Sequence, residues 1–232
     1  MADPYNAEVL PGTSPAIPLV MWGASGHAKV LHELTRSQGY HLLAIFDNAS
    51  DSPPTFLGVP VFIGSAGFEQ WRRQTTLEGV CGLVAIGGAR GRDRLDIQAR
   101  FELDAVTPVT VVHRTAFVAE TVTLGPGTQV LAQTAISADA RLGAACIVNT
   151  AASVDHECLL GDGVHIAPGA RLAGCVEVGD RTLVGAGAVV LPRVRLGHDV
   201  IVGAGAIVID DVPDGLVVYG NPARIIRPHA QT

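Results

Sequence analysis

The second half of the chain carries an aliphatic residue at every sixth position, through seventeen consecutive positions without interruption. These positions are Val112, Val118, Leu124, Val130, Ile136, Leu142, Val148, Val154, Leu160, Ile166, Leu172, Val178, Val184, Val190, Leu196, Val202 and Val208. Valine, leucine and isoleucine make up only about a quarter of the chain, so chance does not produce such a run. A fixed period of this kind is typical of a solenoid.

The period of six residues defines the shape of the repeat. It matches neither the 3.6-residue turn of a helix nor a plain strand alternation, so each unit is predicted to be a short extended segment followed by a corner. Three units would form one triangular coil of a parallel β-helix. The position four residues after each aliphatic holds only Ala, Val, Thr or Cys, which lets the wall turn tightly. Glycine often follows the aliphatic directly, as at Gly125 and Gly143, and we expect it there as a corner residue with positive φ.

Composition excludes several classes of protein. Nearly half of the residues are apolar, which is enough for a real core, and the net charge of −6 gives no basic field for nucleic acid or an anionic membrane. No apolar stretch is long enough to span a bilayer. The first fifteen residues lack the features of a signal peptide, so residues 1–15 are predicted to be a disordered leader and the protein to be cytoplasmic. Cys146 and Cys158 occupy the small position of the repeat and are interpreted as small hydrophobic residues, and no metal-ligand spacing is present.

Residues 16–107 show a different pattern, in which strands alternate with helices. Apolar runs at 17–22, 42–46 and 80–86 are strand candidates, and helical patterns follow the first and third. This order predicts a small, Rossmann-like parallel sheet, whose ligands bind beyond the carboxyl ends of the strands. The polar or glycine residues at those ends are Ser25, Gly26, His27, Asp47, Asn48 and Gly87.

The first turn, Gly23 to His27, reads G-x-x-G-H and departs from the dinucleotide fingerprint. It is either a tight turn that needs glycine for packing or a helix start whose N–H groups hold a diphosphate. Three arginines, at 90, 92 and 94, could contact phosphates or could solvate a helix, and solvation is the favoured interpretation. The β-helix is expected to occupy residues 108–212, with a C-terminal cap at 213–232.

One corner of the repeat departs from the glycine rule and carries a candidate base. Asp155 stands where other units hold glycine, and both it and Glu157 flank His156 with carboxylates that orient an imidazole. Asn149 replaces glycine in the same way one unit earlier, and both residues tolerate positive φ. With eighteen residues per coil, Gly174 is expected directly above His156, at about 4.8 Å, the spacing of neighbouring strands.

His165 lies half a circuit from His156, so the two side chains are not expected to meet one substrate within a single chain. If both belong to one site, that site lies between subunits, and a trimer with three interfacial sites follows. A packed interface histidine is the alternative for His165.

The motifs together resemble a known family. They are Gly23-Ala24-Ser25-Gly26-His27, Asp47, Ala85-Ile86-Gly87, Asn149-Thr150, Asp155-His156-Glu157-Cys158, Val164-His165 and Gly220-Asn221-Pro222-Ala223-Arg224. In this order they resemble the nucleotide-sugar N-acetyltransferases of the hexapeptide-repeat, left-handed parallel β-helix group, of the bacillosamine-pathway and GDP-perosamine type. The sialic acid O-acetyltransferases share the architecture.

This resemblance implies roles for individual residues. It implies that His156 is the general base, that Glu157 raises its basicity and that Asn149 supports the catalytic site. The N–H of Gly174 is implied to face the thioester oxygen, and His165, Gly174, Ala186 and Ala204 to contact acetyl-CoA. The sugar nucleotide is implied to contact Ser25, Gly26, His27, Asp47, Asn48 and Gly87, although the family commonly has aspartate at the position of Asn48.

The sequence therefore predicts a trimeric enzyme that uses acetyl-CoA, without a metal, to acetylate the amino group of a nucleotide-linked amino sugar. A 4-amino-4,6-dideoxyhexose used in bacterial surface-glycan or glycoprotein synthesis is the favoured substrate, with UDP, GDP and dTDP all open as carriers. Two alternatives remain at this point. One is O-acetylation of a sugar of the sialic acid type, and the other is a non-catalytic trimeric β-helix scaffold.

Overall fold

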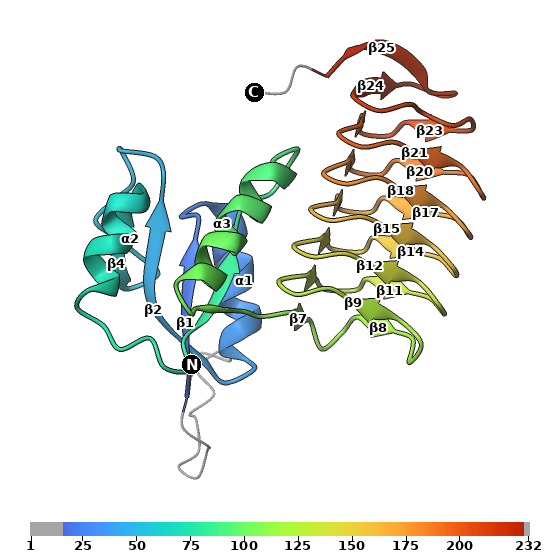
Figure 1. Ribbon diagram of the computed structural model, residues 1–232. Coiled ribbons are helices and arrows are strands. Elements are labelled where there is room, and N and C mark those ends of the chain that lie inside the picture. Colours follow the sequence, from blue (N-terminus) through green and yellow to red (C-terminus); the bar gives the residue numbers. More distant parts are fainter. Residues whose placement is uncertain (1–15, 230–232) are drawn as a thin grey trace, which may run out of the picture.

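The structure is a computed structural model that describes residues 16–229. The leader predicted for residues 1–15 lies outside the described residues, as does the very end of the predicted cap. Two parts lie side by side, a sheet with helices and a tall stack of coils, and the chain passes from one to the other just before β7 (Figure 1). Within residues 16–229 no helix is long and apolar enough to cross a membrane.

The first part is a mainly parallel sheet with the strand order β3-β4-β2-β1-β5-β6. Its strands are β1 (Ile17–Trp22), β2 (Tyr40–Asp47), β3 (Thr55–Phe56), β4 (Val59–Ile63), β5 (Cys81–Val84) and β6 (Thr107–Pro108). The helices are α1 (Gly26–Arg36), α2 (Gly64–Arg72) and α3 (Gly91–Leu103). The predicted strand, glycine turn and helix at the start of the chain are thus confirmed.

Alternation along β1 distributes its side chains to two cores. Leu19 and Met21 pack with α1 on one face, whereas Val20 and Trp22 pack with α2 and α3 on the other. Leu31 and Leu34 of α1 are buried in the first of these cores, whereas Val30 is 44 % exposed. The sequence analysis missed β3, β4 and α2, because their apolar residues are too few and too interrupted by Pro and Gly to show a period.

The second part is a β-helix with three parallel sheets, and successive strands of one sheet are eighteen residues apart, as in Gln129 opposite Ile147. The first sheet contains β7 (Val111–Val112), β10 (Gln129–Val130), β13 (Ile147–Val148), β16 (His165–Ile166), β19 (Leu183–Val184) and β22 (Ile201–Val202). The second contains β8 (Phe117–Val118), β11 (Ala135–Ile136), β14 (Ser153–Val154), β17 (Arg171–Leu172), β20 (Val189–Val190) and β23 (Ile207–Val208). The third contains β9 (Thr123–Leu124), β12 (Arg141–Leu142), β15 (Leu159–Leu160), β18 (Glu177–Val178) and β21 (Arg195–Leu196).

The repeat positions lie where the period placed them. The aliphatics, such as Val148 and Ile166, form one continuous core with the small residues four positions later, and Cys146 and Cys158 are fully buried within it. Burial raises the pKa of the Cys146 thiol to about 12 and that of Cys158 to about 11, so both remain thiols at neutral pH. The top coil is closed by β24 (Leu216–Tyr219) and the antiparallel β25 (Arg224–Pro228).

The explanation of the corner glycines was wrong. Positive φ falls three positions after the aliphatic, at residues such as Ala151 and Glu157, and not at the glycine that directly follows it or at Asn149 and Asp155. Those glycines are needed instead for the close stacking of the coils, because a Cβ at Gly143 or at similar positions would collide with the coil above. They are Gly125, Gly143, Gly161, Gly179, Gly185, Gly197 and Gly203.

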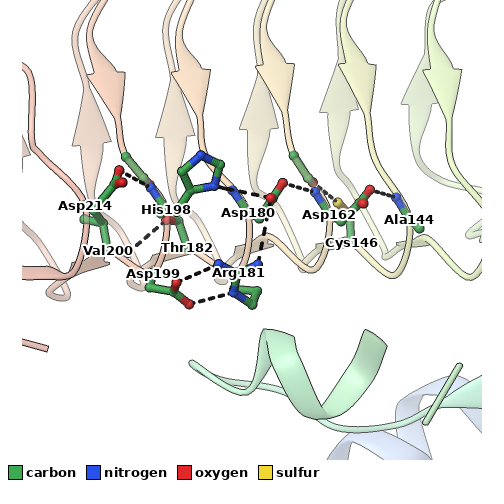
Figure 2. A network of polar contacts seen from close by, with 12 residues as sticks. Ala144, Cys146, Asp162, Asp180, Arg181, Thr182, His198, Asp199, Val200 and Asp214 are labelled. Carbon is green, nitrogen blue, oxygen red and sulfur yellow. Dashed lines mark hydrogen bonds and ion pairs between the residues drawn. The ribbon is translucent and has the colours of Figure 1, made fainter. Parts of the chain in front are cut away.

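A column of polar side chains runs along the corner that joins the third sheet to the first (Figure 2). Asp162 accepts the backbone N–H of Ala144 at 2.8 Å, and Asp180 accepts that of Asp162 at 2.9 Å. His198 Nδ1 accepts the N–H of Asp180, and Asp214 accepts that of His198. One side chain per coil thus caps an otherwise unpaired N–H of the coil below.

The two parts of the chain share a buried polar junction. His27 at the start of α1 lies 2.8 Å from Gln129 Oε1, and Gln129 Nε2 donates to Val84 O at 2.8 Å. Arg94, interpreted from sequence as a solvated helix residue, is in fact fully buried, because its guanidinium donates to the carbonyls of Ala145, Ile86, Gly88 and Gly163. The charge is tolerated there since several carbonyls replace its water shell.

Candidate active site

His156 lies at the corner between β14 and β15 and is held by its two neighbours. Its backbone N–H donates to Asp155 Oδ1 at 2.7 Å, and its Nδ1 lies 3.0 Å from Glu157 Oε2. The imidazole is 54 % exposed, so it is accessible to a substrate. Glu157 has a φ of 58°, and this left-handed backbone carries its carboxylate to the side of the imidazole. Proton donation from Nδ1 to Glu157 leaves Nε2 free to accept a proton.

Gly174 lies on the next coil, directly above His156 and against its imidazole, as the repeat arithmetic predicts. A Cβ on Gly174 would overlap His156 Nε2 and Cε1, so any other residue here would displace the imidazole from this position. The N–H of Gly174 has no acceptor within residues 16–229. On the coil below, Asp155 accepts the N–H of His156, the residue that follows it. The equivalent residue before Gly174 is Ala173, which has no acceptor side chain. The corner therefore sets a base beside a spare backbone donor.

Asn149, Ala186 and Ala204 lie along a different corner, between the first and second sheets, and His165 lies beside this corner at the start of β16. Asn149 Nδ2 is 3.2 Å from His165 Nε2, and Gly88 of the N-terminal part donates its N–H to His165 Nδ1 at 2.9 Å. Ala186 and Ala204 are exposed on two later coils of this corner.

His165 is buried at the junction with the N-terminal part, where only 5 % of it is exposed. Burial, with the nearby Arg94 charge, lowers the pKa of His165 to about 3, so the ring is neutral at physiological pH. Burial likewise lowers the pKa of His27. One full side of the coil, formed by the second sheet, separates the corner of Asn149 from the corner of His156, and the structure does not bring them together within one chain.

A pocket of about 390 Å³ opens at the carboxyl ends of β1, β2 and β5. It is lined by Trp22, Gly23, Ala24, Ser25, Asp47, Asn48, Ala49, Ser52, Ala85, Ile86, Gly87 and Arg90. The carboxylate of Asp47 accepts the N–H groups of Ala24 at 2.6 Å and Ala49 at 2.8 Å, which ties the first two strand ends together. The Ser25 side chain makes no capping hydrogen bond to α1. The helix start thus keeps the N–H character that favours an anion.

The structure gathers four of the six residues predicted to hold the nucleotide, Ser25, Asp47, Asn48 and Gly87, around this pocket. Gly26 and His27 are not among the lining residues, and the His27 ring is turned toward Gln129. Asn48 accepts the indole N–H of Trp22 at 3.2 Å.

The sequence analysis interpreted Arg90 as a solvated helix residue, but Arg90, which follows Gly87 and Gly88 beyond the end of β5, lines the pocket. Its place just after a strand end was the available signal, the same one that selected Gly87.

The family model "PglD N-terminal domain" matches residues 18–96, and "bacterial transferase hexapeptide (six repeats)" matches 157–191 and 175–210. PerB from Caulobacter crescentus, solved with CoA and GDP-perosamine, is 40 % identical with a TM-score of 0.82, over 93 % of this chain and 100 % of that chain.

Two further solved structures are similar over nearly the whole chain. The acetyltransferase domain of PglB from Neisseria gonorrhoeae, in complex with acetyl coenzyme A, is 32 % identical with a TM-score of 0.81, over 91 % of this chain and 100 % of that chain. WeeI from Acinetobacter baumannii is 28 % identical with a TM-score of 0.80, over 90 % of this chain and 99 % of that one. The chain belongs to the hexapeptide-repeat family of nucleotide-sugar N-acetyltransferases.

Proposed function

We propose that the protein transfers the acetyl group of acetyl-CoA to the amino group of a nucleotide-linked amino sugar, with a 4-amino-4,6-dideoxyhexose as the favoured substrate. The observation that carries this proposal is the imidazole of His156, whose Nδ1 faces Glu157 while its Nε2 lies against the bare Gly174 backbone. Similarity to PerB, solved with CoA and GDP-perosamine, supports the choice of both substrates.

The chemistry needs one base and one donor. His156 Nε2 accepts a proton from the amine as its nitrogen attacks the thioester carbon, and Glu157 holds the resulting imidazolium through Nδ1–H. The spare N–H of Gly174 donates to the oxyanion of the tetrahedral intermediate. When the intermediate collapses, the C–S bond breaks and His156 returns its proton to the CoA sulfur. No acyl-enzyme is needed, because the amine attacks the thioester directly.

The pocket at the end of the N-terminal sheet fits the nucleotide. The start of α1 and Ser25 would receive the diphosphate, Arg90 would add a positive charge, and Asp47 or Asn48 would contact sugar or base hydroxyls. Gly26 and His27 stay assigned to this region, although neither lines the pocket.

The coenzyme is proposed to lie along the corner of Asn149, His165, Ala186 and Ala204. The exposed alanines there leave room for an extended chain, and His165 lies beside Gly87 of the nucleotide pocket, 3.6 Å from the position a Cβ on Gly87 would take. His165 would therefore act near the meeting point of the two substrates.

We further propose a homotrimer in which the His156 corner of one subunit faces the His165 corner and nucleotide pocket of the next. The support is that these two corners are separated by a whole side of the coil in one chain, so that a single chain offers no complete site. We place the reaction in the cytoplasm, and the four free cysteines in the described chain fit a reducing compartment.

A substrate panel tests the function. Purified protein is incubated with acetyl-CoA and GDP-perosamine, a UDP-linked 4-amino-4,6-dideoxyhexose, or the matched 4-hydroxy sugar nucleotides, and CoA release is followed with a thiol reagent. We expect turnover only with amino sugars and an N-acetyl product by mass spectrometry. Turnover of the hydroxyl compounds alone would establish an O-acetyltransferase, and no binding of CoA at all would indicate a scaffold.

A further inference from the structure

Cys175 brings a third donor group to the His156 corner. One nitrogen of His156, one carboxylate oxygen of Glu157 and the sulfur of Cys175 all lie within 4.8 Å of one another. The Glu157 oxygen Oε2 is shared, since it lies 3.0 Å from His156 Nδ1 and 3.7 Å from Cys175 Sγ. Neighbouring donors around a tetrahedral zinc ion are about 3.5 Å apart, so these three groups need only small adjustments to bind one ion.

The backbone holds the three donors in place. Glu157 and Cys175 occupy equivalent positions on adjacent coils, with φ of 58° and 60°, and the N–H of Cys175 donates to the His156 carbonyl at 2.9 Å. Imidazole nitrogen, carboxylate oxygen and thiolate sulfur form a ligand set that favours Zn²⁺ over Mg²⁺ or Ca²⁺. Three protein ligands also leave a fourth position open, which an exposed corner gives to water or to a small thiolate.

We propose that His156, Glu157 and Cys175 form a Zn²⁺ site that inhibits the enzyme. On binding, the Cys175 thiol loses its proton to solvent, and the ion takes the place of the proton between His156 Nδ1 and Glu157. A neutral imidazole bound to metal through Nδ1 carries its proton on Nε2. Nε2 is the atom that faces Gly174, so the base is converted into a donor and cannot accept the proton of the amine. This inhibitory consequence rests on the proposed function, whereas the metal site itself does not.

The open fourth position suggests a connection to the reaction product. Thiolate is a preferred zinc ligand, and the sulfur of CoA is released next to His156 if the proposed reaction is correct. CoA and Zn²⁺ should therefore bind cooperatively, each strengthening the other.

Binding is tested without activity, with Co²⁺ as a spectroscopic substitute for Zn²⁺ in a phosphine-reduced protein. We expect a thiolate-to-cobalt charge-transfer absorption in the near ultraviolet that Zn²⁺ removes by competition. Cys175→Ala should abolish the absorption and still fold, because Ala145 and Ala151 already occupy positions of similar φ. The matched control is Cys81→Ala, which removes the other partly exposed thiol and should leave the absorption unchanged.

Inhibition is the second readout. Micromolar Zn²⁺ should inhibit acetyl transfer at least tenfold in wild type and in Cys81→Ala, and hardly at all in Cys175→Ala, whose metal-free activity should be that of wild type. Absence of the cobalt absorption, or equal zinc sensitivity of Cys175→Ala and wild type, would overturn the inference. A normal cobalt absorption in a protein that acetylates none of the amino sugars would instead count against the proposed function alone.

Discussion

Two corners of the same β-helix use the same backbone for opposite purposes. At the corner of Asp162, Asp180 and Asp214, a side chain on each coil accepts an N–H of the coil below, so the donors are consumed one after another (Figure 2). At the corner of His156, Asp155 instead accepts the N–H of the residue that follows it on the same coil. Gly174 follows Ala173, which has no acceptor side chain, and its N–H remains unpaired among the described residues. The first corner thus uses up its donors, whereas the second leaves one beside His156.

The two corner histidines make the contrast sharper. His198 and His156 both stand two residues after a repeat aliphatic, and their side chains are similarly exposed, at 51 % and 54 %. Both Nδ1 atoms lie near a carboxylate, His198 Nδ1 at 3.3 Å from Asp180 Oδ2 and His156 Nδ1 at 3.0 Å from Glu157 Oε2. His198 Nδ1, however, accepts the backbone N–H of Asp180 at 2.9 Å and so belongs to the capping column. Residue type, repeat position and a nearby carboxylate therefore do not identify the base, and the difference is that His198 Nδ1 already serves as an acceptor for the backbone.

Replacing these histidines should give the largest difference. General base catalysis contributes about 10² to 10⁴-fold, so His156→Ala should lower kcat by that order with little effect on KM. Its unfolding free energy should barely change, since the side chain is exposed at a corner. His198→Ala should do the reverse, keeping kcat and losing about 1 kcal/mol of stability as Asp180 N–H loses its acceptor. Steady-state kinetics and urea unfolding measure both effects, and a similar kcat loss in the two variants would contradict the distinction.

A smaller effect is expected if the functional corner is turned into a capped one. Ala173 is equivalent to Asp155 of the coil below. In Ala173→Asp the new carboxylate should therefore accept the Gly174 N–H, as Asp155 accepts the N–H of His156. Removal of one oxyanion donor typically lowers kcat by about 10² to 10³-fold, while the new hydrogen bond should stabilise the fold by about 1 kcal/mol.

Ala119→Asp is the matched control for this substitution, since it adds the same group to the same corner two coils below Asp155 and should leave kcat unchanged. A more stable Ala173→Asp enzyme with full kcat would show that the Gly174 N–H takes no part in the reaction.

Acid sensitivity should come from the buried histidines rather than from the exposed corners. The pKa of His165 is about 3 in the folded protein, below its unfolded value near 6.5, so the unfolded state binds more protons between these values. Stability is therefore complete above pH 6.5 and falls as the pH drops, by about 2 kcal/mol at pH 5 from this residue alone. The lowered pKa of His27 acts in the same direction.

His165→Asn offers a control for this pH dependence, because the amide keeps an acceptor for the Gly88 N–H but does not titrate. Urea unfolding at pH 7.5 and pH 5 should show a shallower loss in the variant. An unchanged pH dependence would assign the acid sensitivity to other groups.

Much of the fold was predictable because the signal repeats. The six-residue period fixes the coils, the buried aliphatics and the position of Gly174 over His156, each of which the structure bears out. The corner glycines were misinterpreted, because φ depends on local backbone geometry that the period does not encode. The stacked coils show that a side chain at these positions would collide with the coil above, as a Cβ on Gly143 would with Asp162.

The N-terminal part was predicted in outline, and its errors have a common cause. The strand ends with Asp47 and Gly87 could be found because burial and turn residues are local signals. The burial of Arg94 and the turning of His27 toward Gln129 depend on contacts with the distant β-helix, which no local pattern reveals. Arg90 and Arg94 look alike in sequence, and only packing separates the pocket residue from the junction residue.

The central claim is that each active site combines the His156 corner of one chain with the nucleotide pocket of another. The direct test mixes two inactive variants, His156→Ala and Gly26→Trp, the latter placing its bulk where a Cβ meets no atom within 4 Å of the same chain. After joint refolding, every mixed trimer that forms a closed ring has one junction between an intact His156 corner and an intact nucleotide pocket. Random 1:1 assembly makes about three quarters of the trimers mixed, each with one intact site of three, so it should restore about a quarter of wild-type kcat/KM. Activity that stays at the level of the separate variants, in trimers shown by mass spectrometry to be mixed, would place each site within one chain and contradict the account.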